Sequence, residues 1–179
     1  MINYFHFYNI VEAYAADQLR LNIINSKNLD PFFKGDINGT DIWISPDLTP
    51  EEKLFNAVHL IGHCIQWGID DKYVELGSVL HINPDADLLF KLQRYEWEAN
   101  CYGLTILHEI GHPELGDWLY EKYREDIIYL TNFYVTGEKV KQVTEIGMLH
   151  PFVYDLVAIP MPKHFRACKI DGTRNGIVI

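Results

Sequence analysis

Residues 49–68, TPEEKLFNAVHLIGHCIQWG, constrain the fold more than any other stretch, because several independent signals mark them as one long helix. Thr49 is a favourable N-cap, Pro50 suits the first helical position, and Glu52 completes a capping box with Thr49. Gly68 predicts the end of the helix. We therefore expect a long helix with well-defined ends here.

His59 and His63 lie four residues apart in this stretch, so a helix places both imidazoles on one face. The pair borders a stripe of apolar residues at helical spacing, which predicts that the histidines lie at the edge of the core. The stripe consists of Leu54, Val58, Ile61 and Ile65. Two histidines spaced in this way can ligate one metal ion, as in the HExxH helix of zinc metallopeptidases.

The residue after the first histidine of an HExxH helix is a glutamate that acts as the general base. In this chain that position is Leu60, and the motif reads HLIGH. The sequence therefore predicts that the metal-binding half of such a site is present and that the group that deprotonates water is missing.

The composition favours one acidic globular domain. With 179 residues, 48% of them hydrophobic, the chain can bury one sizeable core, so we expect a single domain over residues 1–179. The formal net charge of −10 argues against a nucleic-acid surface, because phosphate binding requires clustered Lys and Arg. We expect a protein or peptide partner, and neither direct nucleic-acid binding nor membrane binding.

Cysteine usage and the N-terminal residues indicate the compartment. Cys64, Cys101 and Cys168 are odd in number and form no CxxC motif, so we expect neither a disulfide framework nor a thiolate zinc site. No basic segment followed by an apolar run opens the chain, and no stretch approaches the roughly 18 apolar residues of a membrane-spanning helix. We expect a cytoplasmic protein.

Helical and strand patterns precede residue 49. Residues 7–20 carry apolar residues at helical spacing, and residues 21–25 alternate as a short strand. Asn38 and Gly39 predict a hairpin turn that leads into a strand over residues 41–45.

A second long helix is predicted after residues 69–82, which have no clear period and are expected to be an irregular connection. We place its cap at Asn83, with Pro84 at the first helical position, and its end before Pro113. The remaining predicted elements are helices over residues 113–130 and 138–149, a joint at 133–137 between them, and a strand over 152–159.

Glu96 is the candidate for the third metal ligand. It lies in the run YEWEANCYG on the second long helix, at the edge of the apolar face. A carboxylate in such a place is costly unless it is paired or bound to a metal. Asn100, one turn later, could hold a ligating histidine or the carboxylate in place. We expect His59, His63 and Glu96 to hold zinc or another divalent metal ion.

The order of these motifs resembles the ImmA/IrrE family of zinc metallopeptidases, which are gluzincin-like. The resemblance covers roughly residues 7–149, with the lead-in SPDLTPEEKLF, the HLIGH motif and the later EWEAN. It implies an α+β, zincin-like fold, mostly helical, with a small N-terminal sheet packed on the metal-site helix. It also implies a peptidase-like core over about residues 7–112, C-terminal helices over 113–149 and a tail over 150–179.

The resemblance also implies a function. Members of that family use the metal site to cleave a partner repressor, and their three ligands correspond to His59, His63 and Glu96. Their general base corresponds to Leu60, so this chain departs from the family at the residue that activates water. Because a positioned base typically contributes about 10²–10⁴ in rate, the resemblance implies degenerate or altered peptidase chemistry.

A complete HExxH motif occurs later, at His108, Glu109 and His112, and is an alternative metal site. Pro113 follows it directly, so the helix must end at the second histidine, whereas an HExxH helix normally continues. It also lies about 18 Å along the helix from Glu96, at 1.5 Å per residue, so the two sets cannot serve one metal ion.

Three hypotheses follow for the function. The first is an ImmA/IrrE-like zincin that binds a metal but has lost or altered its hydrolytic chemistry. The second is a non-enzymatic pseudopeptidase that binds an extended protein partner by strand addition along the edge formed by residues 41–45. The third is an active metallopeptidase that uses His108, Glu109 and His112.

Overall fold

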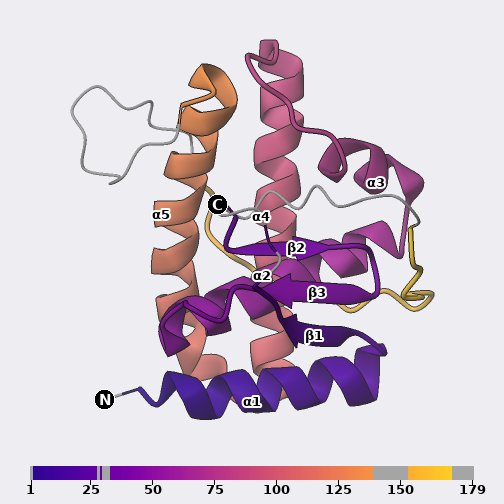
Figure 1. Cartoon of the computed structure of the whole chain (residues 1–179), viewed down its shortest axis with the longest axis vertical. Coiled ribbons are helices and arrows are strands. Elements are labelled where there is room, and N and C mark those ends of the chain that lie inside the picture. Colours follow the sequence, from indigo (N-terminus) through magenta and orange to yellow (C-terminus); the bar gives the residue numbers. More distant parts are fainter. Residues whose placement is uncertain (1, 28, 30–32, 139–152, 171–179) are drawn as a thin grey trace.

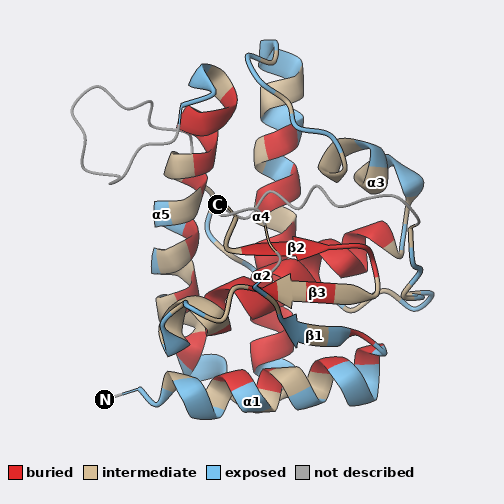
Figure 2. Cartoon of the chain, in the orientation of Figure 1, coloured by how far each residue is buried: buried red, intermediate tan, exposed pale blue. Residues whose placement is uncertain are grey.

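The computed structural model of the chain describes residues 2–27, 29, 33–138 and 153–170. Helix α2 (Pro50–Trp67) runs through its middle, and its N-terminus is the predicted capping box (Figure 1). Thr49 Oγ1 accepts from the Glu52 N–H at 3.3 Å, and the Glu52 carboxylate accepts from the Thr49 N–H at 2.9 Å. Every residue from Leu54 to Trp67 is buried (Figure 2), so α2 is the core helix of the fold.

A small sheet lies against α2 (Figure 1). Its strands are β1 (Asn22–Asn25), β2 (Gly35–Ile37) and β3 (Asp41–Ile44), in the order β1-β3-β2. β3 pairs with β1 in parallel and with β2 in antiparallel fashion. The prediction that residues 41–45 form an open edge for a partner strand is therefore wrong, because both edges of β3 are already hydrogen-bonded.

The β2–β3 hairpin forms where it was predicted. Asn38 Oδ1 accepts from the N–H groups of Thr40 and Asp41 at 3.1 and 2.8 Å, and Gly39 adopts a φ of 92°. A side-chain acceptor followed by a residue in the left-handed region is a combination that Asn-Gly provides at low cost.

The remaining helices surround α2. α1 (Tyr4–Tyr14) continues into a π-helical turn, Ala15–Leu19, and packs on α2. α4 (Ala86–Glu109) crosses α2, and α5 (Gly116–Thr136), which follows a short 3₁₀ turn at Pro113–Leu115, packs on α4. The described residues thus form the expected α+β arrangement, mostly helical with a small N-terminal sheet.

Three local predictions are wrong. Residues 69–82 contain a short helix, α3 (Asp71–Gly77), whose N-cap is Asp70. The cap of α4 is Asp85, so Pro84 precedes the helix. α5 continues through Thr136 to a left-handed Gly137, where a joint was expected. The predicted helix over 138–149 lies almost entirely outside the described residues.

Residues 153–170 run in irregular conformation across the outside of the fold, and the strand predicted over 152–159 is absent from its described part, 153–159. Their polar groups bond to other elements. Asp155 O accepts from Trp97 Nε1 at 3.1 Å, Ile159 O accepts from Thr105 Oγ1 at 2.7 Å, and the Ile170 N–H donates to Asn38 O at 2.8 Å. This segment therefore fastens α4 to the β2–β3 hairpin.

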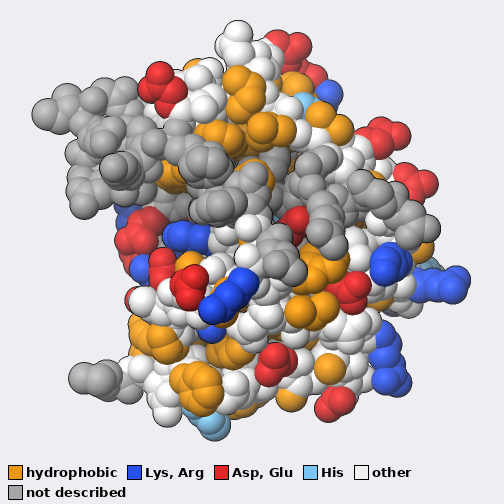
Figure 3. All heavy atoms as spheres, in the orientation of Figure 1, with side chains coloured by type: hydrophobic (Ala, Val, Ile, Leu, Met, Phe, Trp, Pro, Cys, Tyr) orange, Lys and Arg blue, Asp and Glu red, His pale blue; other side chains and the backbone are white. Residues whose placement is uncertain are grey.

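The surface mixes charge types. On the face shown in Figure 3, Asp and Glu side chains are interspersed with Lys and Arg. Among the described residues, no helix combines the length and apolar character that crossing a membrane requires.

The crossing of α2 and α4 depends on a glycine inside the HLIGH motif. A Cβ atom added to Gly62 would lie 2.1 Å from the backbone oxygen of Ala99 on α4. Gly103 lies in the same interface but is less crowded, since its added Cβ would lie 3.4 Å from Val58 O. The two helices are therefore in backbone contact at Gly62.

We predict that Gly62→Ala lowers the free energy of unfolding by about 2 kcal/mol or more, because the methyl group forces the helices apart. Gly103→Ala is the matched control. It has ordinary contact distances and gains about 1 kcal/mol of helix propensity, so it should be neutral or stabilising. Urea unfolding followed by circular dichroism measures both; equal effects of the two variants would contradict this account.

Candidate metal centre

Helices α2 and α4 bring together the three side chains that the sequence singles out as ligands. His63 Nε2 lies 3.1 Å from His59 Nε2 and 3.1 Å from Glu96 Oε2, and His59 Nε2 lies 3.3 Å from Glu96 Oε2. In the described part of the chain, they are the one group of three or more His, Cys, Asp or Glu side chains whose ligating atoms lie within 4.8 Å of one another. Two imidazole nitrogens and a carboxylate oxygen form a donor set that suits Zn²⁺.

The three side chains are almost completely buried, with exposures of 0% for His59, 4% for His63 and 2% for Glu96. Burial alone would raise the pKa of Glu96, but the charge and hydrogen bonds of His63 and His59 outweigh it and hold the pKa well below its usual value. Glu96 is therefore a buried carboxylate that stays ionised, and it presents a negative charge at the shared point.

Each imidazole is held by a carboxamide at its other ring nitrogen. Asn100 Nδ2 lies 2.9 Å from His59 Nδ1, and Gln66 Oε1 lies 2.9 Å from His63 Nδ1. Asn100 was predicted to hold either a histidine or the carboxylate in place, and its side chain contacts the histidine. Gln66 was missed, because a polar residue near the end of a long helix carries no signal of its own.

Aromatic residues complete the surroundings of the three ligands. Tyr134 on α5 donates its hydroxyl to Glu96 Oε1 at 2.9 Å, and Tyr95 stacks on His63 with ring centroids 4.3 Å apart. Tyr134 was not predicted, because a joint was expected at residues 133–137. The buried positions Tyr123, Ile127 and Leu130 of the same helix are its signal, because Tyr134 lies one turn after Leu130 on that face.

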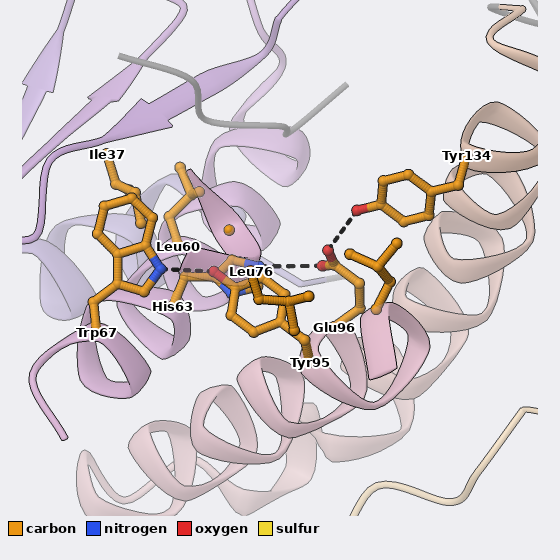
Figure 4. Close-up of a pocket in the computed structure, with 10 residues that line it drawn as sticks. Ile37, Leu60, His63, Trp67, Leu76, Tyr95, Glu96 and Tyr134 are labelled. Atoms are coloured by element: carbon orange, nitrogen blue, oxygen red, sulfur yellow. Dashed lines mark hydrogen bonds and ion pairs between the residues drawn. The ribbon is translucent and has the colours of Figure 1, made fainter. Parts of the chain in front are cut away.

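Leu60 lines a small cavity beside His63 and Glu96 (Figure 4). The cavity measures about 20 Å³, which is room for one water molecule. His63, Glu96 and Tyr134 line it together with side chains that are mostly apolar or aromatic, including Ile37, Trp67, Leu76, Leu92 and Tyr95. Leu60 is 1% exposed, so the position of the usual general base is filled by packed hydrocarbon.

The second motif, at His108, Glu109 and His112, does not assemble. α4 ends at Glu109, and Gly111 turns the chain away with a φ of 83°. Glu109 accepts a hydrogen bond from the Tyr14 hydroxyl, whereas His112 Nδ1 lies 2.9 Å from the Glu114 carboxylate. His108 and Glu109 are exposed, and among the described residues these three side chains do not form a group of closely spaced ligating atoms.

A further acid, Asp126 on α5, interacts electrostatically with the ligand group. Burial raises the pKa of Asp126 to about 6, Glu96 adds to the increase, and the charges of His59 and Lys34 oppose it. No pattern singles out Asp126 beforehand, because it looks like one more charge on a helix rich in acids and bases.

We predict that the metal-free protein loses stability through Asp126 as the pH rises from about 4 to about 6, because the folded state binds the proton more tightly than the unfolded state does. Asp126→Asn removes this loss, so it should raise the free energy of unfolding by on the order of 1–2 kcal/mol at pH 7 and hardly at all at pH 4. Denaturant unfolding at both pH values measures the difference. A benefit of equal size at both would contradict the assignment.

Comparisons with protein-family models, curated proteins and solved structures find no match to this chain. The assignment of the site therefore rests on the chemistry and geometry of its own residues.

Proposed function

We propose that this chain is an ImmA/IrrE-like zincin that binds one divalent metal ion, zinc in the first place, through His59, His63 and Glu96, and whose peptidase chemistry is lost or altered. The observation that carries the proposal is the convergence of three ligating atoms from two helices on one buried point. A metal ion there would be held by three protein ligands and would act as a Lewis acid with one coordination position open.

The surroundings of the three ligands support metal binding over a purely structural ion pair. A lone carboxylate would be satisfied by one histidine, but here two imidazoles converge on the same carboxylate oxygen, Glu96 Oε2. The other oxygen is held by Tyr134, and His63 Nδ1 lies 2.9 Å from the amide oxygen of Gln66. Ligating groups that are themselves hydrogen-bonded are typical of metal sites.

The surroundings of Leu60 support the loss of the usual hydrolysis. Leu60 is buried and occupies the position directly after His59, which is the position of the general base in an HExxH motif. The neighbouring cavity is lined mainly by apolar and aromatic side chains. Within the described residues, no carboxylate other than Glu96 lines that cavity, and Glu96 is already engaged by both histidines.

We predict that the purified protein binds one equivalent of zinc, and that His59→Ala abolishes this binding because it removes one of three ligands. His108→Ala is the matched control, since it removes a histidine of the second motif and should leave the zinc content unchanged. Metal analysis after dialysis gives both values. Retention of zinc by the His59 variant, or its loss in the His108 variant, would refute the proposed site.

Restoring a carboxylate at position 60 tests the loss of the base. Leu60→Glu should raise zinc-dependent hydrolysis of an unfolded protein such as casein by about 10²–10⁴ over the parent, which is the usual contribution of a positioned base. Leu60→Gln has nearly the same shape without the basicity and should show no gain. Equal activity of the two variants would mean that a missing base does not explain the chemistry.

A second candidate function is the binding of a protein partner without catalysis. It is favoured by exposed hydrophobic side chains that come from one short stretch between α3 and the first turns of α4. Val79, Leu80, Ile82 and Phe90 are exposed by 44–51%. Apolar side chains exposed together mark interaction surfaces. The Leu60→Glu experiment separates the candidates, because a scaffold built only for binding gains no hydrolysis from a base.

A further inference from the structure

The two carboxamides beside the ligating histidines allow the tautomer of each imidazole to be assigned. A metal ion binds an imidazole in its neutral form. That form carries one hydrogen, so the nitrogen that donates leaves the other as an acceptor. Nε2 is the atom of both His59 and His63 that faces the shared point, and it can ligate a metal only when the hydrogen is on Nδ1. The direction of the hydrogen bond at Nδ1 therefore decides whether each histidine is ready for a metal.

Gln66 holds His63 in the tautomer that can bind a metal. Its Nε2 donates to the backbone oxygen of Tyr95 at 2.9 Å and lies 3.3 Å from the Glu98 carboxylate, and both of these are acceptors. The amide oxygen Oε1 must then face His63 Nδ1, 2.9 Å away, and can only accept. Neutral His63 therefore carries its hydrogen on Nδ1 and has a free lone pair on Nε2.

Asn100 acts in the opposite direction on His59. Its Nδ2 donates to the backbone oxygen of Glu96 at 2.9 Å, one turn earlier in α4, and a backbone oxygen can only accept. The same nitrogen lies 2.9 Å from His59 Nδ1, which must therefore accept. The hydrogen of His59 is then on Nε2, between the three ligating atoms. Asn100 Oδ1 is buried and has no hydrogen-bond partner within the described residues.

We infer that Asn100 is a positioning residue that holds His59 in the tautomer unfavourable to metal binding. The Asn100 amide then lowers the metal affinity of the site, whereas the Gln66 amide raises it. The inference rests on the metal site proposed above and deepens it. In the metal-free arrangement, the Nε2–H of His59 points at His63 Nε2 and at Glu96 Oε2, 3.1 and 3.3 Å away. His59 is thus the one donor among the three ligating atoms, and His63 Nε2 and Glu96 Oε2, 3.1 Å apart, both present lone pairs to the shared point.

Metal binding requires the hydrogen of His59 to move from Nε2 to Nδ1, with no net gain or loss of a proton. Two donors, Nδ1–H of His59 and Nδ2–H of Asn100, would then face each other. A half-turn of the amide relieves this, since the partnerless Oδ1 comes to accept from Nδ1–H. That turn, however, sets Oδ1 against the Glu96 backbone oxygen and breaks the bond of 2.9 Å now made to it. Asn100 therefore weakens metal binding, whereas Gln66 strengthens it.

Removing each amide in turn provides a matched test, because both changes are neutral in charge and nearly conserve shape. Zinc affinity is measured by competition with a chromophoric chelator. Gln66→Met should weaken zinc binding by about tenfold, the lower end of the usual effect of losing such a partner. Asn100→Leu should bind zinc at least as tightly as the parent, and Asn100→Asp, which can only accept when ionised, about tenfold more tightly. Weaker binding in Asn100→Leu or no gain in Asn100→Asp would overturn the inference.

A second measurement reads the tautomers directly and needs no metal. Long-range ¹H–¹⁵N correlation spectra of the metal-free parent should show His59 with its hydrogen on Nε2 and His63 with its hydrogen on Nδ1. Finding both hydrogens on Nδ1 would overturn the inference even if the protein binds zinc. A parent that binds no zinc, beside an Asn100→Asp variant that does, would support the inference while refuting the proposed function of the parent.

Discussion

The close crossing of α2 and α4 at Gly62 and Ala99 is the contact on which the rest of the structure depends. Because a Cβ atom at Gly62 would meet the Ala99 oxygen at 2.1 Å, the helix axes lie closer there than two ordinary helical residues permit. His59 and His63 flank Gly62 on α2, and Glu96 and Asn100 flank Ala99 on α4. The helix contact thus sets the distance at which two imidazoles can meet one carboxylate.

This geometry accounts for an ionised acid in the core. Burial of Glu96 alone would cost several kcal/mol, and it is tolerated because both carboxylate oxygens have partners: the two histidines on one side and Tyr134 on the other. Tyr134 comes from α5, so the third helix of the bundle also takes part in the site. The packing of α5 against α4 is therefore coupled to the charge of Glu96.

The sequence predicts those parts of the fold whose signals are local. Thr49, Glu52 and Gly68 mark the ends of α2, and the half-apolar surroundings of Glu96 single it out as a candidate ligand. The misses have non-local causes. The sequence contains no sign that β1 pairs in parallel with β3. Helix α3 buries none of its residues, so its sequence shows no helical period. The chain continues as helix through Tyr134 because Phe133 and Tyr134 pack on Leu92. Residues 153–159, the described part of the strand expected in the tail, are irregular, and two of their carbonyl groups accept hydrogen bonds from side chains of α4.

The HLIGH motif combines two separable tasks. Gly62 serves the helix crossing and the histidines serve the ligand group, whereas Leu60 contributes only apolar contact. The effect of a substitution at position 60 on stability therefore depends on the volume and hydrophobicity of the new side chain. The helix crossing and the cluster of His59, His63 and Glu96 depend on other residues. A change of chemistry at position 60 would leave the helix crossing at Gly62 in place, and the cluster of His59, His63 and Glu96 would remain available for a different use.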